Sequence, residues 1–338
     1  MRKLSVFILG TVSALTFAIG GYKKEAAVTA KAEGVSVYVG GMSAGFTLKA
    51  GGVQIVGTCE VLSDTGVSSP ASKAGLKAGD KIVKAAGIKI ETIDELNDIV
   101  NKLQGKTIVL DIIRNKEQIK ISVVPVCDKT TKRYKIGILA RDSVSGIGTV
   151  TYIDGNTRRF GALGHTVLGE NKQELKISDG VVYECSILSI SKGVRGKAGE
   201  LRGMFLNNKM LGNAEKLCTC GIFGEISVEY RLNELQKAIA DSADAMPGNA
   251  YIYSTINGVL PVKYEIEIVK VDKNNKENKN YVIKVTDDKL LSETGGIVQG
   301  MSGSPILQNG KLIGAVTHVF LNDPTRGYGI DIETMLQQ

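Results

Sequence analysis

Residues 299–318 read Gln299-Gly-Met-Ser-Gly-Ser-Pro-Ile-Leu-Gln-Asn-Gly-Lys-Leu-Ile-Gly-Ala-Val-Thr-His318, and this stretch decides the fold. Asn309-Gly310 separates two apolar runs, and this dipeptide is a strong signal for a two-residue β-hairpin turn because both residues tolerate positive φ. A turn in which two glycines bracket Ser302 comes directly before the hairpin. The stretch therefore predicts two antiparallel strands that are entered through a glycine-rich turn.

The Ser302 turn (residues 299–305) has the composition of an oxyanion hole. Glycine adopts backbone conformations that other residues avoid, so we expect the N–H groups of Gly300 and Ser302 to point at one spot. The turn resembles the G-x-S-G-x-P nucleophile turn of chymotrypsin-like serine proteases. The hairpin after it is similar to the strands that form a wall of their substrate pocket. This resemblance implies that Ser302 is a nucleophile.

A serine hydroxyl needs a base in order to act as a nucleophile. The chain contains two histidines, so a histidine base is either His165 or His318, and a site with three or four histidine ligands is excluded. His165 ends a predicted returning hairpin and lies 137 residues before Ser302, which leaves room for most of two barrels. We expect His318, which follows Ser302 along the hairpin, to be structural or to line the pocket. His165 is therefore the predicted base, with a structural histidine as the alternative.

The rest of residues 130–338 favours short strands over helices. Four stretches alternate between apolar and polar residues as strands do, namely residues 146–153, 158–163, 264–271 and 281–285. The best helical pattern covers residues 232–239. We predict a mainly β protein in which residues 130–338 form a chymotrypsin-like double β-barrel peptidase domain.

Residues 34–126 predict a smaller domain before the barrels. Thr92-Ile-Asp-Glu95 is a capping box, in which the hydroxyl and the carboxylate satisfy backbone N–H groups at the start of a helix. Apolar residues recur at helical spacing after it, at Leu96, Val100 and Leu103. The domain is therefore expected to contain one long amphipathic helix among short strands.

The segment Ser69–Ile82 in this domain resembles part of a PDZ domain, of the circularly permuted kind found in exported bacterial proteases. The resemblance implies that a peptide adds as an extra strand beside the long helix, and that a glycine-bearing loop before a strand binds its terminal carboxylate. We assign that loop to Ala44-Gly45-Phe46. The alternative is a packing module with an empty groove.

The N-terminus indicates the compartment. Leu4–Tyr22 contains no charged residue and follows Arg2-Lys3. This length and positive start predict that residues 1–25 are a signal or membrane anchor, and that the rest of the chain is exported.

Charge and cysteine content exclude two other classes. The net charge is +7, but the basic residues are scattered and aromatic residues make up only 5 % of the chain, so we expect no nucleic-acid binding. Five cysteines are an odd number, and the chain is large enough to fold without stabilising disulfide bonds. Both points favour free thiols over a disulfide framework.

Longer strings narrow the resemblance to one family. Residues 294–306 and 314–330, together with Arg141–Thr149 and the string Gly-Ala-Leu-Gly-His165, resemble the stage IV sporulation protein B peptidases of endospore-forming bacteria. The order of N-terminal anchor, PDZ domain and peptidase domain is also similar, over nearly the whole chain.

This resemblance implies a serine endopeptidase that needs no metal or organic cofactor. Such peptidases act in the space between the forespore and mother-cell membranes. There they cleave themselves and a membrane-associated regulatory protein, and so release an intramembrane protease that activates a sigma factor. The family's catalytic residues map onto His165, Asp287 and Ser302.

Asp287 departs from the usual chymotrypsin-like spacing, because it lies only 15 residues before Ser302. It can orient His165 only if its strand crosses near the histidine strand. A turn or capping role is the alternative for Asp287. Four other carboxylates are alternative partners of His165, namely Asp288, Asp272, Asp241 and Asp244.

Two other functions stay open at this point. One is an exported quality-control protease with a PDZ sensor, although in those proteins the protease domain normally precedes the PDZ domain. The other is a non-catalytic PDZ adaptor in which the triad-like residues are structural. The presence of serine, histidine and aspartate together with the glycine turn disfavours the adaptor.

Overall fold

The computed structural model describes residues 34–167 and 179–338. In these ranges the chain is mainly β, as predicted. The predicted signal or membrane anchor at residues 1–25 lies outside the described residues. No helix in the described ranges is long and apolar enough to cross a membrane.

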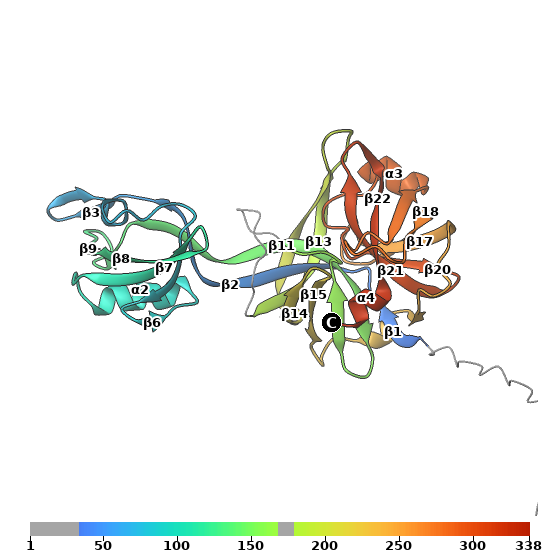
Figure 1. Cartoon of the computed structure of the whole chain (residues 1–338), viewed down its shortest axis with the longest axis horizontal. Helices are drawn as coiled ribbons and strands as arrows, with labels where there is room; N and C mark the ends of the chain where they lie inside the picture. Colours follow the sequence, from blue (N-terminus) through green and yellow to red (C-terminus); the bar gives the residue numbers. More distant parts are fainter. Residues whose placement is uncertain (1–33, 168–178) are drawn as a thin grey trace, which may run out of the picture. The chain divides into compact units, whose positions relative to one another are not determined.

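Six antiparallel strands close into a first barrel (Figure 1). They pair in the order β2, β11, β12, β15, β14, β13 and back to β2. Their side chains fill one core, which includes Phe46, Val150, Phe160 and Ile222. The strands are β2 Ser43–Thr58, β11 Ile138–Asp154, β12 Arg159–Ala162, β13 Gly180–Ser191, β14 Glu200–Cys218 and β15 Gly221–Ile226.

A second barrel repeats this arrangement. Its strands pair in the order β17, β18, β19, β22, β21, β20 and back to β17. The predicted hairpin turn joins β20 and β21, with φ of 52° at Asn309 and 77° at Gly310. Both barrels thus place their first to sixth strands in the order 1-2-3-6-5-4, and the predicted double barrel is confirmed. The strands are β17 Gly248–Ser254, β18 Val262–Val271, β19 Tyr281–Val285, β20 Pro305–Gln308, β21 Lys311–Phe320 and β22 Asp323–Asp331.

The smaller domain is inserted between the first two strands of the first barrel, which corrects the predicted boundary at residue 34. The residues from Ser43 to Lys49 pair with β11, and those from Ala44 to Leu48 also pair with β13 of the same barrel. The second half of β2 then continues into the inserted domain, where Val53 and Gln54 pair with β5.

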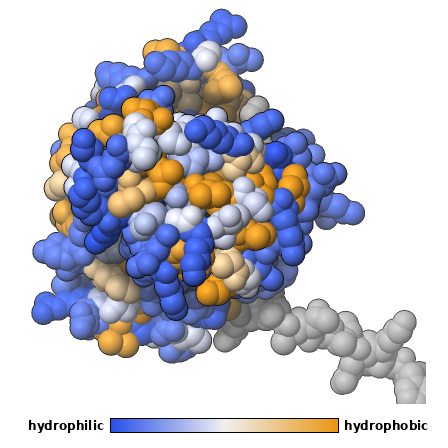
Figure 2. Space-filling view, turned by 90° about the vertical axis from the view of Figure 1, so that its left-hand side faces the viewer, coloured by the Kyte–Doolittle hydropathy of each residue, from blue (hydrophilic) through white to orange (hydrophobic). Residues whose placement is uncertain are grey.

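The inserted domain has the predicted long helix, α2 Ile93–Lys102, and its capping box is formed as expected by Thr92 and Glu95. The helix packs on an apolar core that includes Leu96, Ile108 and Leu110. Figure 2 looks onto this domain and shows apolar residues interspersed with hydrophilic ones. Its other elements are β3 Val61–Ser63, β4 Gly66–Ser68, α1 Pro70–Lys73, β5 Lys81–Ala85, β6 Ile88–Lys89, β7 Ile108–Arg114, β8 Glu117–Val123, β9 Val126–Cys127 and β10 Tyr134–Lys135.

Two further strands connect the barrels, and one of them corrects the predicted helix over residues 232–239. That segment forms a single 3-10 turn, η1 Leu232–Glu234, followed by the strand β16 Lys237–Ala240. β16 pairs with β1 (Val35–Val39) and, in parallel, with β21. Strand partners that are distant in sequence therefore override the local helical pattern. The remaining helices are α3 Asp288–Thr294 and α4 Ile332–Leu336.

Candidate active site

His165 and Ser302 occupy corresponding places in the two barrels. His165 lies in the connection from β12 to β13, the third and fourth strands of the first barrel. Ser302 lies in the connection from β19 to β20, the third and fourth strands of the second barrel. Each barrel therefore contributes one reactive side chain from its own rigid framework.

Strand β11 of the first barrel holds the Ser302 turn of the second. Thr149 donates its backbone N–H to the carbonyl of Ser302 at 2.9 Å, and its Oγ1 donates to the carbonyl of Gly300 at 2.9 Å. Thr151 Oγ1 donates to the carbonyl of Gly303 at 2.8 Å. Both threonines are fully buried, so these bonds are shielded from water and stabilise one conformation of the turn.

The glycines of the turn are required by its geometry. Gly300 and Gly303 have φ of 100° and 94°, a region that residues with a side chain rarely adopt. A Cβ at Gly303 would lie 2.0 Å from the carbonyl oxygen of Thr149 and 2.6 Å from the nitrogen of Leu163. This contact shows that the backbone just after Ser302 touches the backbone just before His165.

The amides of Gly300 and Ser302, the predicted oxyanion hole, make no hydrogen bond within residues 34–167 and 179–338. The neighbouring amides do, since Met301 donates to Val298 at 3.1 Å and Gly303 donates to Val316 at 2.8 Å. The turn thus leaves the two amides that the sequence singled out available to an external acceptor.

The Ser302 hydroxyl donates to the carbonyl of Thr317 on β21 at 2.8 Å. It is therefore paired with the main chain and not with His165 in this structure. The hydroxyl must break this hydrogen bond before it can donate its proton to a base.

The His165 ring is oriented by the main chain. Its Nδ1 lies 2.8 Å from the carbonyl oxygen of Thr166. Because a carbonyl oxygen can only accept, Nδ1 carries the proton and donates it, which leaves Nε2 with a free lone pair. This is the tautomer that a general base requires.

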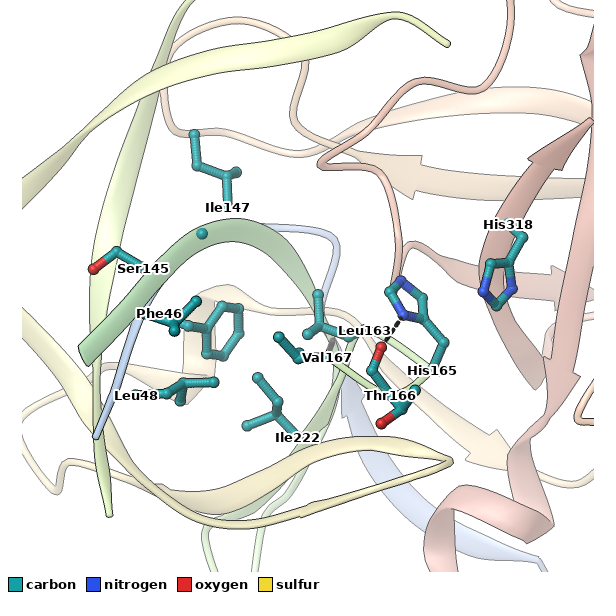
Figure 3. A pocket seen from close by; sticks show the side chains of 12 residues that line it. Phe46, Leu48, Ser145, Ile147, Leu163, His165, Thr166, Val167, Ile222 and His318 are labelled. Carbon is teal, nitrogen blue, oxygen red and sulfur yellow. Dashed lines mark hydrogen bonds between the residues drawn. The ribbon is translucent and has the colours of Figure 1, made fainter. Parts of the chain in front are cut away.

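His165 lies next to the second histidine of the chain. The rings of His165 and His318 are 4.7 Å apart between centroids and tilted by 40° (Figure 3). Burial lowers the pKa of His165 below its ordinary value, and the hydrogen bond to Thr166 opposes this shift only in part. Packing around the ring, helped by His165 and Lys279, lowers the pKa of His318 to about 4. Both imidazoles are therefore neutral at pH 7.

Asp287 does not orient His165 in this structure, which corrects its predicted role. It is the N-cap of α3, where its Oδ1 accepts from the backbone N–H of Leu290 at 2.9 Å. Its Oδ2 accepts from the N–H of Glu265 at 3.3 Å. Asp287 therefore has the capping role that was the alternative prediction. Helix α3 begins directly after it, and the amides in the first turn of the helix need an acceptor.

Three of the other carboxylates considered as partners of His165 lie in other surroundings. Asp241 and Asp244 both form ion pairs with Lys311, at 2.7 and 3.0 Å. Asp288 is the first residue of helix α3. The position that a carboxylate occupies in a chymotrypsin-like triad is taken here by the carbonyl of Thr166, which sequence reasoning missed because any residue type supplies a carbonyl.

The predicted carboxylate-binding loop at Ala44-Gly45-Phe46 is wrong. These residues lie within β2, paired on both edges with β11 and β13, so their amides belong to the first barrel. Phe46 is only 3 % exposed and fills the core of that barrel. A glycine beside apolar residues occurs both in loops and in buried strands, and the partners β11 and β13 make this segment a strand.

Another segment of the inserted domain meets the description of that loop. Gly137 has φ of 74° and directly precedes β11. The chain before it reaches the end of the long helix, where Asn101 Oδ1 accepts from the N–H of Tyr134 at 2.9 Å. Asp142, on the β11 strand after the loop, accepts from the N–H of Ile93 at the start of the helix at 2.9 Å. Residues 134–142 therefore run along the helix as a glycine-bearing loop followed by a strand.

No group of three or more His, Cys, Asp or Glu side chains in the described part of the chain could hold a metal ion. The site is built instead from a hydroxyl, an imidazole with a free Nε2 and two unpaired amides. Such a set of groups can carry out acyl transfer.

We expect NMR titration of the full-length protein to place the pKa values of His165 and His318 below 6.5, with that of His318 near 4. Between pH 6.5 and about 4, unfolded His318 binds a proton that the folded state does not. The free energy of unfolding should therefore fall on acidification through this window. A pKa of 6.5 or higher for both rings would contradict the desolvation of the two rings by the groups packed around them.

The capping role of Asp287 predicts different outcomes for two substitutions. Asp287→Ala should lower the free energy of unfolding by about 1 kcal/mol, while Asp287→Asn, which can still cap, should cost at most a few tenths. Chemical denaturation measures both. The NMR pKa of His165 should be unchanged in either variant, because the carboxylate makes no bond to the ring. A shift of that pKa in Asp287→Asn would restore Asp287 as its partner.

Two family models and a solved structure match parts of the chain. Residues 132–336 match the family model described as SpoIVB peptidase S55, and residues 50–124 match the model of the PDZ domain. Among solved structures, the crystal structure of the Rv3671c protease in its inactive form aligns with a TM-score of 0.31 and 13 % identity, covering 57 % of this chain and 82 % of that one.

Curated relatives match over shorter stretches. "Putative zinc metalloprotease all3971" of Nostoc sp. is 33 % identical over 82 residues, covering 23 % of this chain and 22 % of its own. "Putative zinc metalloprotease CA_C1796" of Clostridium acetobutylicum is 37 % identical over 71 residues, covering 21 % of each chain. The chain thus spans about a fifth of the length of these relatives. The family match covers most of the chain, including His165 and Ser302, and the protein belongs to the SpoIVB peptidase S55 family.

Proposed function

We propose that this peptidase cleaves peptide bonds through an acyl-enzyme on Ser302, with His165 as the base and the amides of Gly300 and Ser302 as the oxyanion hole. One observation carries the proposal. The Thr166 carbonyl fixes the His165 tautomer with Nε2 free, beside a turn whose two unpaired amides flank the hydroxyl. A general base needs this tautomer beside the hydroxyl that it deprotonates.

The reaction begins when the Ser302 hydroxyl leaves the Thr317 carbonyl and turns toward His165. Its oxygen attacks the peptide carbonyl carbon while Nε2 of His165 takes its proton, and the resulting oxyanion accepts hydrogen bonds from the two amides. The C–N bond then breaks and His165 returns the proton to the leaving amine. A water molecule, deprotonated by His165, hydrolyses the ester and restores Ser302.

The Thr166 carbonyl stabilises the imidazolium that forms in each of these steps. It accepts the Nδ1–H bond throughout, so the ring keeps its orientation when Nε2 gains a proton. The lowered pKa of His165 keeps the ring neutral, and hence able to act as a base, down to mildly acidic pH.

We propose further that the protein acts in signalling during endospore formation, by cleaving itself and a membrane-associated regulatory protein in the space between the forespore and mother-cell membranes. The support is the family match together with the sequence of residues 1–25, whose positive start and apolar stretch are typical of an export signal or anchor. A quality-control protease is the alternative assignment.

The PDZ domain is proposed to bind the C-terminus of a protein. The loop before β11 supplies a glycine with φ of 74°, and the strand after it runs beside the long helix. The chain that leads into this loop contains Lys129, Lys132, Arg133 and Lys135. Two of these cations are already paired, Lys132 with Asp64 at 3.7 Å and Lys135 with Asp128 at 3.3 Å. A glycine-bearing loop before a strand is the place where a PDZ domain binds a terminal carboxylate, through its backbone amides.

Ser302→Ala should abolish labelling by a fluorophosphonate probe and reduce self-cleavage of the full-length protein at least about a thousandfold. Ser304→Ala is the matched control, because the Ser304 hydroxyl is buried and bonded to Ser254 at 3.1 Å. We expect it to be labelled at close to the wild-type rate. Wild-type protein that neither reacts with the probe nor cleaves itself would favour the non-catalytic adaptor.

Gly137→Ala should weaken binding of a peptide with a free C-terminus about tenfold, measured by fluorescence anisotropy with the full-length Ser302→Ala protein. Its Cβ would lie 2.5 Å from the Cys59 carbonyl, at a φ that costs a non-glycine residue about 1–2 kcal/mol. Gly75→Ala is the control, since Gly75 has a similar φ of 82° but open space around it. Equal binding of a C-terminally amidated peptide would refute the carboxylate site.

A further inference from the structure

A cavity of about 370 Å³ opens in the first barrel beside His165. Apolar side chains form most of its wall, and they come from segments far apart in sequence: Phe46, Leu48, Leu163, Val167 and Ile222. In Figure 3 the His165 ring stands between these apolar side chains and His318. One side of the cavity is therefore the His165 imidazole, and the rest of its wall is mostly apolar.

The cavity is large enough for a bulky side chain. A dry apolar cavity of about 150 Å³ already accepts a benzene ring, so 370 Å³ admits an aromatic or branched aliphatic side chain with room to spare. The two neutral histidines are the only ionisable residues that line it in the described chain. A carboxylate or ammonium group would therefore lose its hydration there without gaining an ion-pair partner.

The catalytic role proposed for His165 indicates which part of a substrate lies beside the cavity. Its Nε2 must first contact the Ser302 hydroxyl and then the nitrogen of the leaving amine. This nitrogen belongs to the substrate residue after the cleaved bond, so that residue lies against the imidazole. The residue after the cleaved bond is therefore the part of the substrate nearest to a cavity that His165 itself lines.

We propose that this cavity binds an apolar side chain of the substrate residue directly after the cleaved bond, and so sets specificity on the leaving-group side. This inference rests on the proposed function, because it requires His165 to protonate the leaving amine. It adds a selection rule that the catalytic groups alone do not contain: Leu, Ile, Met or Phe is accepted at this position, and Asp, Glu or Lys is rejected.

Gly146 offers a way to fill the cavity without disturbing its walls. It lines the cavity, and a Cβ placed on it would meet no atom within 4 Å. Gly146 is paired directly with Phe46 across β11 and β2, so its side chain would point to the same face as that of Phe46. Gly146→Val therefore adds an isopropyl group to the cavity from a strand position that suits a β-branched residue.

The test maps cleavage sites by mass spectrometry after digestion of a peptide library with the full-length protein. Wild type should cleave before Leu, Ile, Met or Phe at least about tenfold better than before Asp, Glu or Lys. In Gly146→Val the preference should shift at least about tenfold toward Gly, Ala or Ser. Gly57→Val is the matched control, because it makes the same change on β2 with only ordinary contacts to Leu139, and it should keep the wild-type preference.

Fluorophosphonate labelling separates the two proposals. The probe loses only fluoride and has no residue after a cleaved bond, so labelling of Ser302 in the wild type tests the catalytic groups independently of the cavity. Labelled enzyme with no preference after the cleaved bond, or with a preference that Gly146→Val leaves intact, would overturn the cavity assignment alone. So would a preference before the bond that this variant removes, whereas labelled enzyme that cleaves no peptide would overturn both proposals. Wild-type enzyme without labelling or cleavage would overturn both proposals.

Discussion

The hydrogen bonds from Thr149 and Thr151 to the carbonyls of Gly300, Ser302 and Gly303 are the constraint on which the site depends. They join a strand of the first barrel to the turn that carries the hydroxyl of the second. Both threonines are fully buried, so breaking one bond would leave a polar group without a partner and without water, at a cost of about 1–3 kcal/mol. The turn is therefore held in a conformation that only glycine permits at two positions, and its unpaired amides are one result of that conformation.

Strand β11 connects this constraint to the other functional parts of the chain. Its first residues, from Ile138, lie along the PDZ helix, residues 144–147 line the cavity, and Thr149 and Thr151 hold the Ser302 turn. Because the PDZ domain is inserted between β2 and β11, a peptide that adds beside this strand would contact the same secondary-structure element that positions the nucleophile. Insertion at this point links the two domains more directly than a linker after a complete barrel would.

In this structure the Ser302 hydroxyl and the two histidines are in a non-reacting arrangement. The Ser302 hydroxyl is bonded to the Thr317 carbonyl, and both histidines are neutral, so neither ring carries a charge before a substrate arrives. A charged pair in the same place would lose much of its hydration on burial. The use of the Thr166 carbonyl in place of a carboxylate fits this arrangement, since a neutral acceptor fixes the tautomer of a neutral ring without adding a charge.

The sequence by itself determined those elements that depend only on the conformational preferences of neighbouring residues. The Asn309-Gly310 hairpin, the Thr92–Glu95 capping box and the glycines around Ser302 all follow from backbone conformations that few residue types allow. Tertiary structure alone decided the features that depend on partners distant in sequence. Ala44-Gly45-Phe46 became a buried strand because β11 and β13 pair with it, and residues 237–240 became a strand because β1 and β21 do. The acceptor for His165 was decided in the same way, because a backbone carbonyl carries no signal in the sequence and only the folded chain shows which one faces the ring.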